Sequence, residues 1–384
     1  MKKILILGGS HRDIPLIKAS QELGYFVITL GDRDYYLGHE YSDKNYKINF
    51  NDLNKVREII KKENIDYLIP GSGEASYLNT VKLAHELNIG NFDTLETAQL
   101  VHNKWKFKKF CLKHKISTPK GYIYTSEDTL QDLDFPVIVK PTNLSGGRGV
   151  SVVKSPKELE TALKSAKEVS DEVFVEEFIE GELIAYSVFL QYQKIIYGFT
   201  GKDATYLNPY LVTTAYPISL DEKVLKKLKK DIENLSESLN LVDGMFHLQV
   251  IIKQKVPYII DVTRRIPGDL YPDLIEYCDK IQYSKAVIKA YIGVPIEDEF
   301  IPKATKDFII RHCVMPSANG IYKELTIDKK INTHIIHKLN LIPENTQIKD
   351  FLHTQLEIIF IKINKENLLM LNNLNTLVRP SIII

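Results

Sequence analysis

The chain contains only three cysteines in 384 residues, namely Cys111, Cys278 and Cys313. Their number is odd and their spacing fits no metal motif, so the sequence gives no disulfide framework and indicates a reducing compartment. An excess of charge is also lacking, because 50 basic residues stand against 49 acidic ones. This balance gives no electrostatic reason to expect nucleic acid or membrane partners. We therefore expect a cytoplasmic protein.

Long apolar runs are missing as well. No run approaches the roughly 20 residues that a membrane span needs. The start, MKKILILGGS, is basic, but its apolar stretch of about five residues is too short for a signal peptide. The length suggests two to three domains with ample cores, and we find no internal repeat.

The first region predicts a βαβ unit. Residues 4–7 and 26–30 are apolar and strand-like, and an amphipathic helix over residues 14–23 lies between them. The spacing from Gly8 to Asp32 suits a dinucleotide fold. However, the turn GGSHRD lacks the full three-glycine pattern, so the sequence supports a NAD site only poorly.

Residues 137–150, VIVKPTNLSGGRGV, form an apolar strand that leads into a glycine-rich loop. Lys140 places a cation at the strand end, where it can neutralise phosphate oxygens. Small residues in the loop let backbone N–H groups approach an anion, and an arginine adds donors. These candidates are Ser145, Gly146, Gly147, Arg148 and Gly149. An ordinary hairpin loop is the alternative, and the spacing does not fit a P-loop.

Residues 256–269, VPYIIDVTRRIPGD, form a second buried strand that ends in an acid, a hydroxyl and two arginines. Asp261 and Thr263 leave the same face of an extended chain. Residues 245–252, MFHLQVII, precede them across a short turn, which predicts a hairpin with Gln249 beside Asp261. Oxygen ligands so placed suit Mg²⁺ carrying ATP phosphates. The alternative is a half-exposed polar face of a sheet.

Together these segments resemble the ATP-grasp superfamily, which includes biotin carboxylase, D-alanine:D-alanine ligase and glycinamide ribonucleotide synthetase. The resemblance covers nearly the whole chain. It implies an α/β fold, α+β in the ATP-binding part, with three domains. These are an N-terminal Rossmann-like domain over residues 1–95, an ATP-grasp domain over 96–295 with a small lid subdomain at about 118–187, and a C-terminal β-rich domain over 296–384. Strands are expected at 308–311 and 357–363, and a helix near 365–372.

The resemblance also implies an ATP site. Lys104 matches the first phosphate-binding lysine of the family, although it lies among five lysines between residues 104 and 113 that could form a solvated helix face. Lys140 matches the second lysine, and residues 145–149 match the flexible loop over the β- and γ-phosphates. The segment VFVEEFIEG resembles the hinge that holds the nucleoside. It assigns adenine contacts to Glu176, Phe178 and Ile179, and ribose contact to Glu177 or Glu182.

The metal ligands depart from the family pattern, which has Glu, Glu and Asn where this chain has Gln249, Asp261 and Thr263. Replacing a carboxylate by an amide removes a Coulomb attraction of about 4 kcal/mol at 4 Å and an effective dielectric of 20, before solvation offsets it. We therefore expect one well-held Mg²⁺ on Asp261, which Mn²⁺ can replace, and a second ion that binds weakly. His247, beside this strand position, is interpreted as structural.

The reaction implied by the resemblance is ATP-dependent joining of a small carboxylate and an amine through an acyl phosphate, with release of ADP and phosphate. Arg264 matches the arginine that holds the acyl phosphate, and Arg265 adds a second fork for a carboxylate. A surface salt bridge is the alternative for this pair. Lys202 matches a lysine near the phosphates.

The acceptor substrate should face the crevice at the carboxyl ends of the N-terminal strands. Gly9, Ser10 and Glu74 are the candidates there, although Glu74 could simply cap its helix. We expect small-molecule partners and a possible homodimer. Two other functions stay open: a purine-biosynthesis-type ligase or carboxylase, and a nucleotide-binding protein without ligase activity, which Gln249 and Thr263 would favour.

Overall fold

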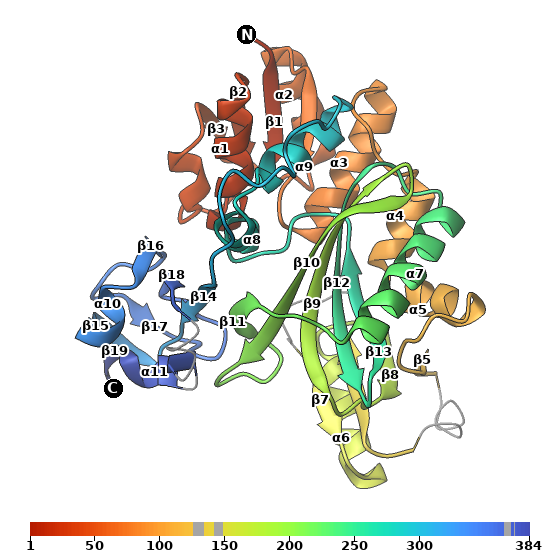
Figure 1. Cartoon of the computed structure of the whole chain (residues 1–384), viewed down its shortest axis with the longest axis vertical. Helices are drawn as coiled ribbons and strands as arrows, with labels where there is room; N and C mark the ends of the chain where they lie inside the picture. Colours follow the sequence, from red (N-terminus) through yellow and green to blue (C-terminus); the bar gives the residue numbers. More distant parts are fainter. Residues whose placement is uncertain (126–133, 142–148, 365–369, 372) are drawn as a thin grey trace.

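The computed structural model describes residues 1–125, 134–141, 149–364, 370–371 and 373–384. Ser145, Gly146, Gly147 and Arg148 lie outside the described residues, as does most of the helix expected near residues 365–372. Figure 1 shows the N-terminal part at one end, a long central sheet, a small sheet at the opposite end and the C-terminal strands at one side.

The N-terminal part is a parallel sheet of order β3-β2-β1-β4. Its strands are β1 (Lys3–Leu7), β2 (Phe26–Leu30), β3 (Lys44–Tyr46) and β4 (Tyr67–Pro70). The helical segments are η1 (His11–Asp13), α1 (Ile14–Glu22), η2 (Leu37–Glu40), α2 (Leu53–Glu63) and α3 (Glu74–Leu87). Residues 4–7 are fully buried, which explains their continuous apolar run. The predicted βαβ unit is confirmed, because β1 and β2 pair in parallel.

The central sheet has eight strands in the order β13-β12-β9-β10-β11-β14-β18-β16. Their bounds are β9 (Glu182–Gln191), β10 (Lys194–Thr205), β11 (Val212–Pro217), β12 (Gly244–Lys253), β13 (Val256–Thr263), β14 (Ile309–Val314), β16 (Ile335–Asn340) and β18 (Glu357–Lys362). Helix α7 (Glu222–Ser238) buries Val224, Leu228 and Ile232 against one face. The predicted hairpin is confirmed, with Gln249 opposite Asp261.

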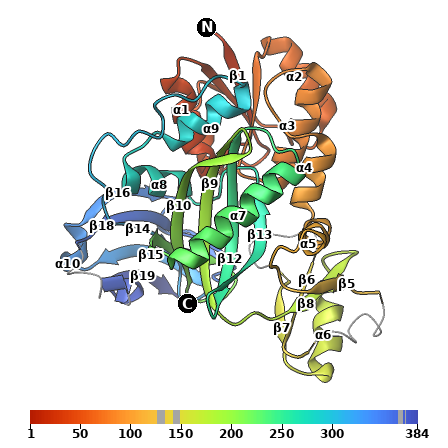
Figure 2. The ribbon, with the colours of Figure 1, turned by 45° about the vertical axis from the view of Figure 1, so that its right-hand side comes forward.

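The small sheet has the order β5-β8-β6-β7, with β5 (Gly121–Ile123), β6 (Val137–Pro141), β7 (Ser151–Val153) and β8 (Val173–Glu177). Helix α6 (Pro156–Lys167) packs on it through Leu159 and Leu163. Helices α4 (Leu95–His102) and α5 (Lys104–Lys113) lead into it from the N-terminal part. Figures 1 and 2 both place this sheet at the end of the molecule opposite the N-terminal sheet.

The C-terminal part is attached to the central sheet. Strands β14, β16 and β18 extend that sheet, because β11 pairs with β14. A second sheet has the order β17-β15-β19, with β15 (Gly320–Ile327), β17 (Gln347–Ile348) and β19 (Val378–Ile383), accompanied by α10 (Lys329–Asn332) and α11 (Leu374–Leu377). Helices α8 (Tyr271–Asp279) and α9 (Tyr283–Ile292) share a core with the N-terminal strands. The N-terminal part, the central sheet and the C-terminal strands therefore meet near residue 270. Within the described ranges, no helix is long and apolar enough to cross a bilayer.

Candidate active site

A cavity of about 290 Å³ lies where the central sheet meets the N-terminal part and β14, and we call it the polar cavity. Most of its lining side chains carry charge or hydrogen-bonding groups. These are Arg12, Ser72, Glu74, His102, Lys104, Asp203, Tyr210, His247, Gln249, Asp261, Thr263, Arg265, Asp269, Tyr271 and Arg311. Six of them, Glu74, Lys104, Gln249, Asp261, Thr263 and Arg265, were predicted as site residues from the sequence.

Small residues on the central sheet leave room for this cavity. Asp261 pairs with Gln249, Gln249 with Ala185, and Ala185 with Gly201, so one row crosses four strands. Paired residues point to the same face of a sheet, so the acidic end of the row stands beside two positions with little or no side chain. A Cβ on Gly201 would come within 2.4 Å of the Tyr271 hydroxyl, which shows how closely the cavity wall approaches the sheet.

The acidic side of the cavity contains more than the predicted hairpin. Burial alone would raise the pKa of Asp261, but Lys104 and Lys140 lower it, so this carboxylate is ionised. Asp203 lies on β10 on the same face, two residues beyond Gly201. The Asp203 carboxylate hydrogen-bonds Gln249, and burial raises its pKa to about 6. Its Oδ1 is buried and has no hydrogen-bond partner among the described residues.

These residues fit Mg²⁺ by their chemistry, since Asp261, Gln249 and Asp203 offer only oxygen ligands. In the part of the chain that the structure describes, no group of three or more His, Cys, Asp or Glu residues could hold a metal ion. The protein oxygens alone are therefore too few for a complete shell. The remaining ligands would have to come from nucleotide phosphates and water.

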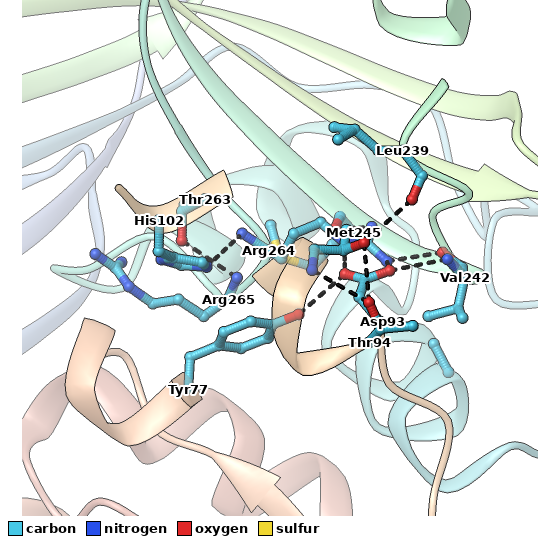
Figure 3. A network of polar contacts seen from close by, with 12 residues as sticks. Tyr77, Asp93, Thr94, His102, Leu239, Val242, Met245, Thr263, Arg264 and Arg265 are labelled. Carbon is cyan, nitrogen blue, oxygen red and sulfur yellow. Dashed lines mark hydrogen bonds and ion pairs between the residues drawn. The ribbon is translucent and has the colours of Figure 1, made fainter. Parts of the chain in front are cut away.

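The two adjacent arginines have opposite environments. Arg264 is only 4 % exposed, and its Nε donates to Asp93 Oδ2 at 2.8 Å. Its Nη1 and Nη2 donate to the carbonyl oxygens of Met245 and Val242, both at 2.7 Å. Figure 3 shows Arg264 within this network and the Arg265 side chain extending away from it. The structure does not place Arg264 at the polar cavity, because its guanidinium is bound to the protein, and its role in holding the acyl phosphate stays a prediction.

Arg265 and Arg311 face the polar cavity. Arg265 Nη1 donates to the Ile266 carbonyl oxygen at 2.9 Å, and burial lowers the pKa of its guanidinium. Arg311 Nη1 donates to the Asp269 carbonyl oxygen at 3.0 Å. In both arginines Nε is buried without a hydrogen-bond partner in the described chain. Buried donors without partners are costly, so these two groups are suited to an anionic ligand.

Behind the cavity, Glu176 binds two lysines. Lys140 Nζ lies 2.6 Å from Glu176 Oε1, and Lys108 forms a second ion pair with Oε2. Both ammonium groups lie 5.5 Å from the centre of the Phe174 ring. Burial lowers the pKa of Lys108 to about 8, and the two lysines lower the pKa of Glu176 despite its burial. The Glu176 carboxylate is therefore committed to lysines, and only its backbone is left for an adenine contact.

Known proteins resemble this chain in sequence and in fold. A family model described as "D-ala D-ala ligase C-terminus" matches residues 98–268. The formate-dependent phosphoribosylglycinamide formyltransferase of Wolinella succinogenes is 25% identical over 279 residues, 68% of this chain and 70% of the relative. The enzyme of the same name from Prochlorococcus marinus is 22% identical over 349 residues, which cover 87% of each chain.

Solved structures share the whole fold. The L-amino acid ligase from Bacillus licheniformis aligns with a TM-score of 0.85 at 16% identity, over 100% of this chain and 99% of that one. Phosphoribosylglycinamide synthetase from Anaerococcus prevotii aligns over 100% of both chains, with a TM-score of 0.79 and 21% identity. Residues 98–268 thus match a ligase family model, and the whole chain has the fold of these two solved structures.

Lys202 does not occupy the position expected of an ATP-grasp catalytic lysine. It pairs with Ile184 and Tyr216 and therefore points to the α7 side of the sheet, opposite Asp203. Its ammonium lies 3.8 Å from the carboxylate of Glu182, which is largely exposed. The structure does not bring Lys202 to the polar cavity, and its catalytic role stays a prediction. Strand alternation, which places residues 201 and 203 on the cavity face, could have indicated this placement from the sequence.

The remaining ATP-grasp hinge predictions stay predictions. Phe178 N already donates to the Pro136 carbonyl oxygen at 3.2 Å, and Glu177 accepts from Lys120 N at 3.2 Å. Ile179 is buried beside the end of β8. In the glycine loop only Gly149 is described. Its φ of +70° and a clearance of 2.8 Å from an added Cβ to Pro141 show that this position needs glycine.

The predicted substrate contacts are divided between two cavities. Glu74 lines the polar cavity, where its carboxylate lies 3.6 Å from His102 Nδ1. Gly9 and Ser10 line a neighbouring cavity of about 500 Å³. The two cavities share Ser72 and Gly73 in their walls, so they adjoin one another.

Three residues at the site were missed in the sequence. Arg311 interrupts the apolar strand FIIRHCV, which is a signal for a buried charge with a function. Asp203 is the neighbour of Lys202, the residue that the sequence predicted at this site. Lys108 is one of the five lysines between residues 104 and 113 for which a solvated helix face was the alternative, but it is buried together with its neighbours Phe107 and Cys111.

Proposed function

We propose that the protein is an ATP-dependent ligase that joins a small carboxylate to an amine through an acyl phosphate and releases ADP and phosphate. One observation carries this proposal. The polar cavity sets two incompletely paired guanidinium groups, those of Arg265 and Arg311, each with a buried Nε, near a set of acidic and amide oxygens. Such a cavity can hold a carboxylate and metal-bound phosphates together, as in-line phosphoryl transfer requires.

ATP would lie along the face that contains Lys104, Lys140 and Asp261. Both lysines are near enough to lower the pKa of Asp261, and phosphate oxygens would add to the negative charge that they balance. Asp261, Gln249 and Asp203 would hold Mg²⁺, which supplies neutralisation of phosphate charge when bound. The Glu176 ion pairs fix the Lys140 ammonium beside Phe174.

The chemistry needs no protein nucleophile. A carboxylate oxygen of the first substrate forms a bond to the γ-phosphorus while the bond to the ADP oxygen breaks. The amine then attacks the acyl carbon, phosphate leaves, and the nitrogen loses a proton to form the amide. Arg265 and Arg311 hold the carboxylate and the charge that develops on the transferred group.

His247 has a structural role in this proposal. Burial lowers its pKa to about 3, so the imidazole is neutral near pH 7. Its Nδ1 hydrogen-bonds the Ser187 hydroxyl at 2.7 Å, and its ring packs edge-on against Tyr271. It shapes the wall beside Thr263 and supplies no charge.

The test is ADP release with Mg²⁺ and ATP across pooled small carboxylic acids, with and without pooled amines. We expect turnover only when both pools are present, and loss of turnover in Arg265→Ala. Ile336→Ala, on an exposed position of β16, serves as the control for handling and folding. Tight ATP binding with no ADP release in any mixture would instead favour a nucleotide-binding protein without ligase activity.

A purine-biosynthesis-type ligase is the second candidate. Two relatives at 22–25% identity are named formate-dependent phosphoribosylglycinamide formyltransferase, and this supports an acceptor that carries a phosphoribosyl group. The same assay with a phosphoribosyl amine as the acceptor would test it.

A further inference from the structure

The neighbouring cavity of about 500 Å³ differs in chemistry from the polar cavity, and we call it the apolar cavity. Tyr36, Leu37 and Phe50 line it from the N-terminal part, and Leu341 and Ile342 line it from the segment after β16. Apolar and aromatic side chains therefore face it from both sides. A cavity of this size and lining is typical of a site for a small organic group.

The position where a Rossmann-like turn would bind phosphate is already filled by the protein. The Asp13 carboxylate accepts from Ser10 N and Ser10 Oγ, both at 2.9 Å, and from Ser72 N at 2.7 Å. It fits closely, since a Cβ on Gly8 would come within 2.7 Å of Asp13 Oδ2. Asp13 is 2 % exposed. The backbone donors after β1 and β4 are thus engaged, and a second anion beside this carboxylate would be repelled.

No spare cation faces the apolar cavity in the described part of the chain. Arg12 is the only lysine or arginine in its lining, and its Nε donates to Asp269 Oδ1 at 3.0 Å. Asp269 also accepts from Gln355 Nε2 at 3.1 Å. The His353 ring bonds both Asp350 and Asn208. A phosphate monoester would find only a guanidinium that is already paired.

A substrate can extend from one cavity into the other. Ser72 and Gly73 line both, and Glu74, at the start of α3, lines the polar cavity directly after them. A substrate amine beside Glu74 would lie in the polar cavity with Arg265. The rest of the same molecule would then enter the apolar cavity past Gly73, where an added Cβ would meet only Ser76 Cβ, at 3.7 Å.

We propose that the apolar cavity receives the uncharged apolar or aromatic group of the amine substrate, which is an apolar or aromatic amino acid or amine without a phosphate. This inference rests on the proposed ligase function and specifies its acceptor. The aromatic rings of Tyr36 and Phe50 and the branched side chains of Leu341 and Ile342 supply the contact area, and no ion pair needs to be broken.

The first test is binding without turnover, measured on the full chain by saturation-transfer NMR. The probes are the apolar and aromatic amino acids, the corresponding amines, and ribose 5-phosphate. We expect at least one apolar or aromatic probe to bind and ribose 5-phosphate not to bind. Leu341→Glu should weaken that binding about tenfold or more, because it places a charge in an apolar wall. Ile336→Glu, exposed on β16 outside the cavity, should leave it unchanged.

Other results would overturn the inference. These are binding of ribose 5-phosphate with no binding across the apolar panel, or equal binding to wild type and Leu341→Glu. The readout separates this inference from the ligase itself. ADP release with a phosphoribosyl amine would uphold the ligase and refute the apolar acceptor. Binding of the panel without ADP release in any mixture would refute the ligase and leave the apolar cavity as a binding site for such groups.

The second test creates the missing anion site. In Asp13→Ala the N–H groups of Ser10 and Ser72 lose their acceptor, so this variant should bind inorganic phosphate, which wild type should not. Asp13→Asn removes the charge but keeps an oxygen that these N–H groups can bind, so it is the matched control and should bind no phosphate. Phosphate binding to wild type that Leu341→Glu or Asp13→Asn alters would contradict the inference.

Discussion

Arg264, which is buried, and its neighbour Arg265, which is half-buried, belong to two regions with different roles. Around Arg264, the Nε and both terminal nitrogens reach an acceptor within 2.8 Å, and Tyr77 and Val242 complete the coordination of Asp93. Around Arg265 and Arg311, a buried donor on each side chain has no partner in the described residues. In the first region the guanidinium is held by hydrogen bonds within the protein, so its role is structural. In the second region each arginine has a buried donor that a ligand can bind.

Burial and charge alone therefore do not identify a binding residue in this fold. A buried ion pair is retained when its hydrogen bonds are complete, and breaking it leaves an uncompensated charge. An incomplete set of donors in a cavity is better explained by a ligand. The four predictions that follow test this distinction.

Arg264→Met should have the largest effect, and it should act on folding. Removing the guanidinium leaves the Asp93 carboxylate buried and unpaired, which typically costs about 3–5 kcal/mol of unfolding free energy. Urea denaturation measures this loss. The double variant Asp93→Asn/Arg264→Met should recover part of it. Unchanged stability combined with lost ADP release would show that Arg264 acts in catalysis after all.

Arg265→Lys should act on turnover and leave stability nearly unchanged. The lysine keeps the charge but loses the planar fork, so kcat/KM should fall about 100- to 1000-fold, as for the removal of a donor to a developing charge. Steady-state ADP release and a thermal melt of the same sample check this. A lower melting temperature with unchanged kcat/KM would show that Arg265 has a structural role.

Asp203→Asn should weaken the response to Mg²⁺. The change removes a carboxylate whose Oδ1 has no partner in the described chain, and the apparent Mg²⁺ affinity in the presence of ATP should fall roughly tenfold. Gln249→Glu is the matched variant, since it restores a carboxylate on the same row and should increase the affinity. Equal Mg²⁺ titrations for all three proteins would remove Asp203 and Gln249 from the metal site.

Lys202→Ala should have the smallest effect, less than about threefold in kcat/KM. Its side chain points to the α7 side of the sheet and meets an exposed carboxylate, and such ion pairs contribute little. The variant is a neighbouring control for Asp203→Asn. A loss of 100-fold or more in ADP release would restore the catalytic role predicted from the sequence.

Much of the architecture could be predicted because it depends on local patterns. Alternation along residues 245–263 and a short turn were enough to predict the register that sets Gln249 beside Asp261, and the apolar runs of the N-terminal strands predicted the βαβ unit. The acidic side of the polar cavity follows largely from that hairpin.

The rest depends on contacts that local patterns do not contain. Strand β13 ends at Thr263, so alternation no longer decides whether Arg264 or Arg265 faces the cavity. That choice is set by Asp93, about 170 residues earlier in the chain, which binds Arg264. Arg311 reaches the cavity only because β14 pairs with β11, a long-range contact. The filling of the N-terminal anion position by Asp13 likewise requires the turns after β1 and β4 to meet.

The most direct test of the central claim follows the oxygen atoms of the substrate acid. A carboxylate labelled with ¹⁸O is supplied with ATP, Mg²⁺ and the amine that supports turnover, and the released phosphate is analysed by mass spectrometry. If a substrate carboxylate attacks the γ-phosphate, one labelled oxygen should appear in each phosphate formed. Phosphate released without the label would show that the carboxylate is not phosphorylated, and would contradict the proposed ligase mechanism.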